Sequence, residues 1–555
     1  MRRGWFFVLT LGVVGFFGWD WGVVFAGKDG ATRLETPDAV CASCHQAIYD
    51  RYERTAMARG SGVAMEGLIP GAFRHGESGV EYRVFERGGA GWMSYERGAG
   101  SAKGELRGER RLEYFLGSGH RGRTYLYRVG QQWFELPVNF YTPRKDWEMT
   151  PAFEHAPAMP GTLPVDPNCL HCHATQVQEA LPTGRSAYAG APFRQGGVGC
   201  SACHGDGAEH VARKGLGAIV NPAKLSASRR ESACIQCHLE GDAVVYRPGR
   251  SLAEFKAGDE LRDYAVYFVK AQQVGGGRRA TSQYEALLRS ACRRASGERM
   301  TCTTCHDPHS EPEPAERVGY FRARCLSCHT GAKMETHHAE QRDCAVCHMP
   351  SRGTTDISHE QVTDHDIEAR PEVRLREPAG ETELVPVGGF LADDRTLGLG
   401  YAQLGQKGDA GARTRALRLL TQAELAGARD RELEVRLGYL RQVAGDAAGA
   451  RLAYAVALAE DPYEPTALAN LAVLDAGAGR VPEAVRLLER LTDGDPSQSA
   501  AGLNLVFIDC RLGRKKEAAE LSRRLLEVNP DFQPLRDFLR TGMYGGQRCA
   551  VGGGI

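Results

Sequence analysis

Seven copies of one short pattern constrain this chain more than any other feature of its 555 residues. Each copy has two cysteines separated by two residues and then a histidine; six copies lie within residues 169–348 and one lies far upstream. CxxCH is the attachment pattern of c-type haem, because the two thiols add to the two vinyl groups of one porphyrin and the histidine ligates the iron. The cysteines are Cys41, Cys44, Cys169, Cys172, Cys200, Cys203, Cys234, Cys237, Cys302, Cys305, Cys325, Cys328, Cys344 and Cys347, and the proximal histidines are His45, His173, His204, His238, His306, His329 and His348. We therefore predict seven covalently attached haem c groups.

Zinc sites and redox-active thiol pairs also use CxxC spacing, so a single copy would leave the cofactor open. Structural zinc needs the pairs to combine into sets of four ligands, and it does not explain the histidine that follows every pair. The motifs leave only Cys292, Cys510 and Cys549 of the 17 cysteines. We therefore expect cofactor chemistry and no disulfide framework, with Cys510 a buried thiol on a repeat helix.

The N-terminus has the features of an export signal, which covalent haem attachment outside the cytoplasm requires. Two arginines precede an apolar run over residues 4–19, and residues 24–26 fit a small-residue cleavage site. We predict a signal peptide over residues 1–26 and a periplasmic or otherwise extracytoplasmic protein. An uncleaved anchor is the alternative and the one route to membrane association, but Asp20 in mid-span makes a membrane helix costly.

The charges of the chain argue against one class of partner. Lys plus Arg and Asp plus Glu each number 69, so the formal net charge is zero. Nucleic-acid binding proteins carry a basic excess, and we therefore predict no nucleic-acid partner.

The long interval after the first motif has strand character. A short helix is predicted over residues 46–59, and a β-rich insertion follows at about residues 70–150. Its alternating segments are separated by glycine-rich breaks, as in an antiparallel meander. The predicted strands are residues 80–84, 92–95, 112–115 and 124–127.

The six later motifs follow one another too closely to build ordinary apolar cores between them. The porphyrins themselves must form the core, with short helices and loops around them. We therefore predict a haem-cored, mostly irregular and α-helical cytochrome domain over residues 38–370, in which neighbouring haems approach closely enough for electron hopping.

A different repeat begins beyond the last motif. Small residues and prolines recur every 34 residues, the period of tetratricopeptide repeats, in which small side chains stand at the helix crossing and Pro follows the second helix. We predict a linker over residues 371–389, an all-α tetratricopeptide solenoid over residues 390–540 and a flexible tail over residues 541–555. The recurring positions are Ala450, Ala484, Ala518, Pro462, Pro496 and Pro530.

The concave face of such a solenoid usually binds a protein or peptide. We therefore predict that the repeats dock a redox partner protein. A packing or dimerisation module is the alternative.

The sixth ligand of each iron separates an electron carrier from an enzyme. His309 stands too close to His306 to bind the same iron, so we predict that it ligates a neighbouring haem. Met57 is predicted to give the first haem His/Met coordination and a raised potential; core packing is the alternative, and His75 is then the next candidate. The full set of distal candidates is Met57, His75, His210, His309, His337, His338, His359 and His365.

Three segments resemble the multihaem cytochromes with doubled CxxCH motifs, which are related to the tetrahaem electron carrier of nitrifying bacteria and more distantly to multihaem nitrite reductases and hydroxylamine oxidoreductases. They are CSACHGDGAEH from Cys200, CTTCHDPH from Cys302 and CAVCHMP from Cys344. The resemblance covers roughly residues 38–370 and the repeats. It implies bis-His haems in stacked pairs, with distal ligands at His210, His309, His359 and His365. The CxxCK motif of many pentahaem nitrite reductases is absent from the sequence.

These features predict an exported multihaem cytochrome that carries electrons, with a repeat module that docks its partner. One alternative is a multihaem oxidoreductase acting on a small nitrogen or sulfur compound at one open haem. Another is a tetratricopeptide assembly scaffold with the haems as electron input. An electron carrier is favoured over a catalyst, and the occupancy of the sixth positions distinguishes the two.

Overall fold

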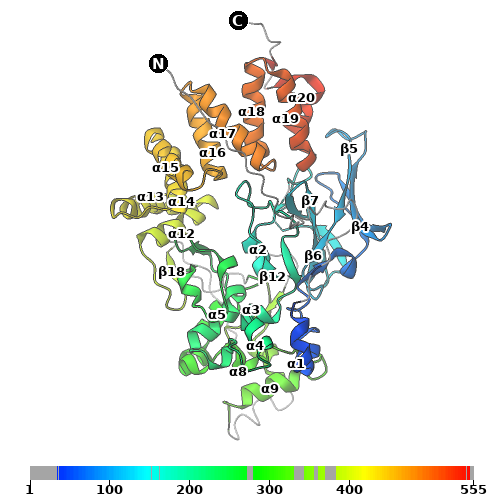
Figure 1. Cartoon of the computed structure of the whole chain (residues 1–555), viewed down its shortest axis with the longest axis vertical. Coiled ribbons are helices and arrows are strands. Elements are labelled where there is room, and N and C mark those ends of the chain that lie inside the picture. Colours follow the sequence, from blue (N-terminus) through cyan, green and yellow to red (C-terminus); the bar gives the residue numbers. More distant parts are fainter. Residues whose placement is uncertain are drawn as a thin grey trace, which may run out of the picture.

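The structure is a computed structural model in which the CxxCH helices, the β-sheets and the repeat helices occupy different parts of the molecule. In Figure 1 most of the CxxCH helices lie in the lower half, the sheets that follow the first motif lie on the right, and the repeats arch over the left and top. The structure describes residues 34, 37–151, 153–161, 163–271, 279–330, 343–354, 361–368, 383–544 and 547–549. The predicted signal peptide, His337, His338 and His359 lie outside these described residues.

The first motif lies in helix α1 (Ala39–Tyr52). The helix begins after Pro37 and Asp38, a start signal that the prediction of residues 46–59 overlooked. His45 interrupts the helical backbone with φ −116° and ψ 34°, so the motif histidine stands at a kink. The predicted helix was therefore placed too late in the chain.

Two antiparallel sheets make up the β-rich region. One sheet has the order β2-β3-β4-β5, and the other runs β1-β6-β7-β8-β11 with β9 and β10 attached through β7. The chain crosses between the sheets at Glu113, inside the predicted strand over residues 112–115, so the region is no single meander. Tyr82, Tyr125 and Phe134 are buried in its core. The strands are β1 (Ser61–Val63), β2 (Gly71–Arg74), β3 (Glu81–Arg87), β4 (Ala90–Arg97), β5 (Leu106–Leu112), β6 (Tyr114–Leu116), β7 (Gly122–Val129), β8 (Gln132–Glu135), β9 (Val138–Tyr141), β10 (Asp146–Met149) and β11 (Leu163–Pro164), with the 3-10 helix η1 (Ala64–Gly67) after β1.

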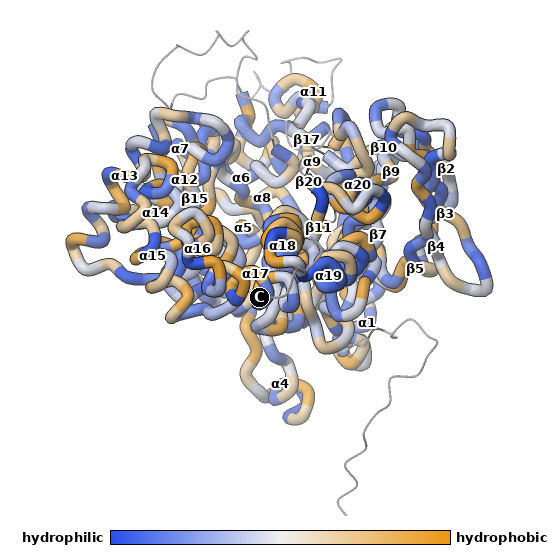
Figure 2. The backbone as a smooth tube through the Cα atoms, turned by 90° about the horizontal axis from the view of Figure 1, so that it is seen from above, coloured by the Kyte–Doolittle hydropathy of each residue, from blue (hydrophilic) through white to orange (hydrophobic). Residues whose placement is uncertain are grey.

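Short helices carry the later motifs. They are α2 (Pro167–His171), α3 (Cys200–His204), α4 (Ala208–Ala212), α5 (Ala227–His238), α6 (Gln283–Arg289), α7 (Ala291–Ser296), α8 (Cys302–Cys305), α9 (Arg317–Leu326) and α11 (Cys344–His348), with 3-10 helices η2 (Pro222–Lys224), η3 (Leu252–Glu254), η4 (Leu261–Asp263) and η5 (Gly297–Arg299). Helices α1, α3, α4, α8, α9 and α11 bury none of their side chains. Among the described residues, no hydrophobic side chain is buried between Phe193 and Ile235 or between Leu287 and Val362. Helix α4 projects from the body of the molecule (Figure 2).

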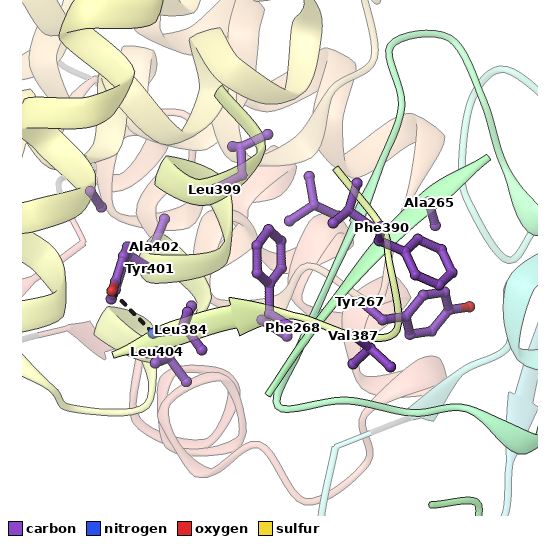
Figure 3. Packing of buried hydrophobic residues seen from close by; sticks show 14 of the residues in the cluster. Ala265, Tyr267, Phe268, Leu384, Val387, Phe390, Leu399, Tyr401, Ala402 and Leu404 are labelled. Atoms are coloured by element: carbon purple, nitrogen blue, oxygen red, sulfur yellow. Dashed lines mark hydrogen bonds between the residues drawn. The ribbon is translucent and has the colours of Figure 1, made fainter. Parts of the chain in front are cut away.

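The segment predicted as a linker contributes a strand. Residues 369–382 lie outside the described chain, but β18 (Leu384–Pro386) pairs with β15 in a three-stranded sheet. The hydroxyl of Tyr401 accepts the N–H of Leu384 at 3.1 Å, and both residues belong to one buried cluster with Phe268 and Phe390 (Figure 3). The Pro-, Glu- and Gly-rich composition concealed this apolar strand. The remaining strands are β12 (Ala174–Val177), β13 (Phe193–Gly196), β14 (Ala243–Tyr246), β15 (Ala265–Lys270), β16 (Ser351–Gly353) and β17 (Gln361–Thr363).

The C-terminal region is a run of paired helices. The 34-residue period brings small residues to the helix crossings: a Cβ on Gly438 would lie 2.6 Å from a ring carbon of Tyr454. The first helices of successive pairs contact one another, α12 with α14 and α14 with α16, and so line the inner face of the arch. The helices are α12 (Asp394–Gln406), α13 (Ala410–Leu425), α14 (Arg431–Val443), α15 (Ala447–Glu460), α16 (Pro465–Gly477), α17 (Val481–Gly494), α18 (Ser499–Arg511), α19 (Lys515–Val528) and α20 (Gln533–Thr541).

Both ends of the arch are attached to the rest of the chain. At its beginning, Arg395 donates to the carbonyl oxygen of Tyr246. At its end, Asp531 forms a bidentate ion pair with Arg97 at 2.6 and 2.7 Å, and both side chains are almost fully buried. The repeats are thus built into the molecule and are not a free arm.

Cys510 forms a disulfide with Cys549, so the expectation of a free buried thiol was wrong. Both half-cystines are buried, and they hold the hairpin of β19 (Met543–Tyr544) and β20 (Gln547–Arg548) against α18. The ring of Tyr544 lies 4.8 Å from that of Phe507. The predicted tail therefore begins with an ordered hairpin.

Candidate haem-binding site

Three motif histidines face a second histidine from elsewhere in the chain. The ring centroids of His45 and His210 lie 6.4 Å apart with planes inclined by 13°. The corresponding values are 6.0 Å and 12° for His204 with His309. His306 and His365 give 6.2 Å and 28°. In each pair one ring belongs to a CxxCH motif and the other to a predicted distal ligand.

The spacing of these rings fits one iron between two imidazoles. A metal–imidazole nitrogen bond is about 2.0–2.1 Å long. The ligating nitrogen stands roughly 1 Å from the ring centre, so two rings on one metal have centroids about 6 Å apart. The donor sets at these three places therefore fit bis-His haem.

Backbone carbonyl groups fix the orientation of three of these histidines and of the proximal His348. A carbonyl oxygen only accepts, so each Nδ1 donates a proton to it and Nε2 keeps the lone pair that binds a metal. The Nδ1 contacts are His204 with Val220 (2.8 Å), His210 with Gly217 (3.2 Å), His348 with Glu368 (2.6 Å) and His365 with Thr363 (2.9 Å). Burial also lowers the pKa of His173 and of His365, which keeps both imidazoles neutral at pH 7.

The distal histidines interlock the motifs. His210 follows the third motif and faces the first; His309 follows the fifth and faces the third; His365 follows the seventh and faces the fifth. Each of these irons would thus be held by two segments that are distant in sequence. This pattern links the odd-numbered motifs into one series.

The attachment cysteines also meet in pairs from different motifs. The sulfur atoms of Cys41 and Cys200 lie within 4.8 Å of each other. Three further pairs of thiols lie close enough to interact electrostatically: Cys172 with Cys237, Cys234 with Cys302, and Cys325 with Cys344. Each of the seven motifs therefore has another motif close to it.

Two predicted distal ligands occupy other positions. His210, not Met57, lies opposite His45, and the side chain of Met57 is 37% exposed. His75 is buried in the β-rich region, where Nδ1 contacts Ser78 at 2.9 Å and Nε2 contacts the carbonyl oxygen of Glu154 at 3.0 Å. Neither residue is therefore placed to complete the first iron site.

The other proximal histidines have no facing histidine ring among the described residues. They are His173, His238, His329 and His348. The candidates His337, His338 and His359 lie outside the described residues and remain proposals.

Sequence reasoning missed Asp38, which is buried at the start of α1 and reaches the third motif. An aspartate directly before a motif-bearing helix is a recognisable capping signal. Its contact with a segment more than 150 residues later has no signature in the sequence.

Three family descriptions match parts of the chain. "Cytochrome c554 and c-prime" matches residues 145–205, "Doubled CXXCH motif" matches residues 295–334, and "Tetratricopeptide repeat" matches residues 444–503. The first two cover part of the region with facing histidines, and the third covers helices of the arch. The chain thus combines segments of multihaem c-type cytochromes with tetratricopeptide repeats, which confirms the resemblance seen in the sequence.

Two solved structures of tetratricopeptide-type proteins each match about a quarter of the chain. A structure titled "MamA AMB-1 P212121" is 23% identical and covers 25% of this chain and 78% of its own, with a TM-score of 0.22. "Crystal structure of YrrB: a TPR protein with an unusual peptide-binding site" is 18% identical, with 26% and 74% covered and a TM-score of 0.24. No curated protein matches the chain.

None of the helices among the described residues is both long and apolar enough to cross a membrane.

Proposed function

We propose that this protein is an exported electron carrier with seven covalently bound haems and a repeat domain that engages a partner protein. The single observation that carries the proposal is the set of three facing imidazole pairs at 6.0–6.4 Å, each joining a CxxCH histidine to a distal histidine. Bis-His coordination closes the iron to substrates and suits electron transfer. Haem, when bound, supplies the one-electron redox centre.

The chain's own residues hold the imidazoles in place. Carbonyl acceptors at Nδ1 fix the tautomer, and the two covalent cysteines of each motif prevent loss of the cofactor. Contacts between motifs then keep the seven sites together as one relay. The export signal that the sequence predicts over residues 1–26 agrees with this function, because c-type cytochromes are typically extracytoplasmic.

Mass spectrometry of the exported, denatured protein tests the haem count. Seven complete motifs predict the mass of the mature chain plus seven haems. A fully matured sample with five or fewer would contradict the count.

Spectroscopy tests the distal ligands. The variant His309→Ala should convert one low-spin haem to high spin, because His309 faces His204 at 6.0 Å. The matched control is His155→Ala, whose exposed ring pairs with Glu77 and faces no motif histidine. An unchanged electron paramagnetic resonance spectrum of His309→Ala would remove this ligand from the proposal.

A second candidate function is an oxidoreductase with one open iron. It is favoured by the fact that no histidine ring of the described residues faces His173, His238, His329 or His348. Three further histidines are engaged elsewhere: His75, His155 and His171. Bis-His coordination of all seven irons would therefore need every remaining histidine, namely His120, His337, His338 and His359.

Carbon monoxide separates the two candidates. The reduced electron carrier should bind none, whereas the oxidoreductase should bind one equivalent for each open iron. The ferrous spectrum after addition of the gas measures this directly.

The proposed partner site is the inner face of the arch, lined by α14, α16 and α18. A redox partner protein or a peptide segment of it is the expected ligand, since tetratricopeptide solenoids bind such ligands on their concave surface. Because both ends of the arch are anchored, binding there would hold the partner beside the haem-binding region. Substitution of the exposed Val473 on α16 by Glu should weaken partner capture and leave the haem spectrum unchanged.

A further inference from the structure

Asp38 stands where two of the proposed haem sites meet. It is the N-cap residue of α1, the helix of the first motif, and it is buried with only 8% of its surface exposed. Its Oδ2 accepts the backbone N–H of Cys200 at 2.6 Å, and Cys200 opens helix α3 of the third motif. One carboxylate therefore marks the start of both haem-binding helices.

The surroundings hold this carboxylate at the junction. Gln195 donates its side-chain N–H to the same oxygen at 2.7 Å. A Cβ on Gly199 would collide with Oδ2 of Asp38 and with Nε2 of Gln195, so only glycine leaves room there. The hydroxyl of Thr175 accepts the N–H of Gly199 at 2.6 Å from the opposite side. These contacts fix the position of the carboxylate relative to both motifs.

The charge of this group is close to both attachment points and has no basic partner. A carboxylate oxygen of Asp38 and the sulfur atoms of Cys41 and Cys200 all lie within 4.8 Å of one another. No Lys, Arg or His within the described part of the chain forms an ion pair with it. A buried, uncompensated anion favours the more positive state of a nearby redox centre, which for iron is the ferric state.

We infer that Asp38 is a positioning residue that couples the first and third haems and lowers the reduction potentials of both. This inference rests on the proposed haem sites at His45/His210 and His204/His309. It goes beyond electron carriage in general, because it assigns to one carboxylate a downward shift of the reduction potentials of these two haems.

Redox titration of the holoprotein tests the inference. Each step is the one-electron reduction of a ferric to a ferrous haem by an added mediator. Absorbance and electron paramagnetic resonance monitor each step. Asp38→Asn keeps an oxygen that can accept from Cys200 and removes only the charge. Two steps should move to higher potential, those of the low-spin signals that are lost in His210→Ala and in His309→Ala.

Two further variants make the result decisive. Asp38→Ser places an uncharged hydroxyl group at the same position and should give the same two shifts if the asparagine variant does not accumulate. Asp166→Asn is the matched control, because Asp166 caps α2 of the second motif alone, through Asn168 and Cys169. It should leave the two steps in place.

No shift, a shift of one step only, or an equal shift in Asp166→Asn would overturn the role of Asp38. The wild-type titration judges the proposed function separately. A protein that shows its haem steps but does not respond to Asp38→Asn would keep the function and lose this inference.

Discussion

The haem-motif region and the repeat region are both mostly helical, yet their helices are stabilised in opposite ways. The motif helices α1, α3, α8 and α11 bury no side chain. Helix α12 alone buries nine residues, and the small residues at the crossings of the repeats are almost inaccessible. The repeat region therefore holds itself together by side-chain packing, and the motif region must use covalent haem for the same purpose.

Because of this difference in side-chain burial, the repeat region should fold without a cofactor, whereas the motif region should need haem in order to fold. An isolated helix shorter than about 12–15 residues is marginal in water, and α3 and α8 have five and four residues. Without buried apolar area, nothing in the chain offsets the conformational entropy of ordering such segments. The β-rich region stands between the two cases, with a core of its own beside the first motif.

The largest effect should come from withholding the haem. A chain without residues 1–26, produced in the cytoplasm, would receive no haem, and its motif region should lose its fold entirely. Limited proteolysis with mass spectrometry should then find early cuts between Phe193 and Ile235 and between Leu287 and Val362, where no hydrophobic side chain of the described residues is buried. A resistant fragment should span residues 394–541. The exported holoprotein is the control. Equal resistance of both regions would contradict the comparison.

A smaller effect is expected at the anchor between the β-rich region and the repeats. Asp531→Ala leaves Arg97 buried and unpaired, and it also removes the acceptor for the N–H of Met159. Loss of one partner of a buried ion pair costs about 3–5 kcal/mol. Urea unfolding followed by circular dichroism measures the loss.

The matched control for this anchor is Asp537→Ala. Asp537 pairs with Arg540 on the surface, where such a pair contributes about 0–1 kcal/mol. Equal losses for the two variants would show that the buried pair does not anchor the repeats.

The disulfide of the last repeat should contribute somewhat less. Cys549→Ser opens a link that spans 39 residues, and removal of such a link costs about 2–4 kcal/mol. The thermal transition of the repeats should fall while the haem spectrum stays constant. Cys292→Ser, which alters a free thiol, is the control and should leave the transition in place. A fall in the haem-linked transition instead would mean that the two regions do not unfold separately.

The same contrast explains how much the sequence could predict. Chemistry with a fixed local spacing was readable: CxxCH gave the attachment residues, and the 34-residue period gave the repeats. Contacts between distant segments were not readable, as with His210 facing His45 across 165 positions or Asp531 meeting Arg97. Met57 stands where the resemblance to the tetrahaem carriers implies a ligand, whereas the histidine that faces His45 follows the third motif. The disulfide was missed because Cys549 follows the last repeat and carries no pattern.

The smallest effect concerns the β-rich region, whose own side chains should make its stability depend on pH. Burial raises the pKa of Glu135 from 4.5 to about 7. Between these two pH values the carboxyl group is therefore protonated in the folded protein and ionised in the unfolded chain. Stability is therefore fully present below pH 4.5 and is lost as the pH rises towards 7. The whole pKa shift would correspond to about 3 kcal/mol of folding free energy, and partial solvent access reduces this contribution to about 1–2 kcal/mol.

Glu135→Gln should flatten this pH dependence in urea unfolding at pH 5 and pH 8, whereas Glu109→Gln, at an exposed ion pair, should keep it. An undiminished slope in Glu135→Gln would move the source of the pH dependence to the motif region.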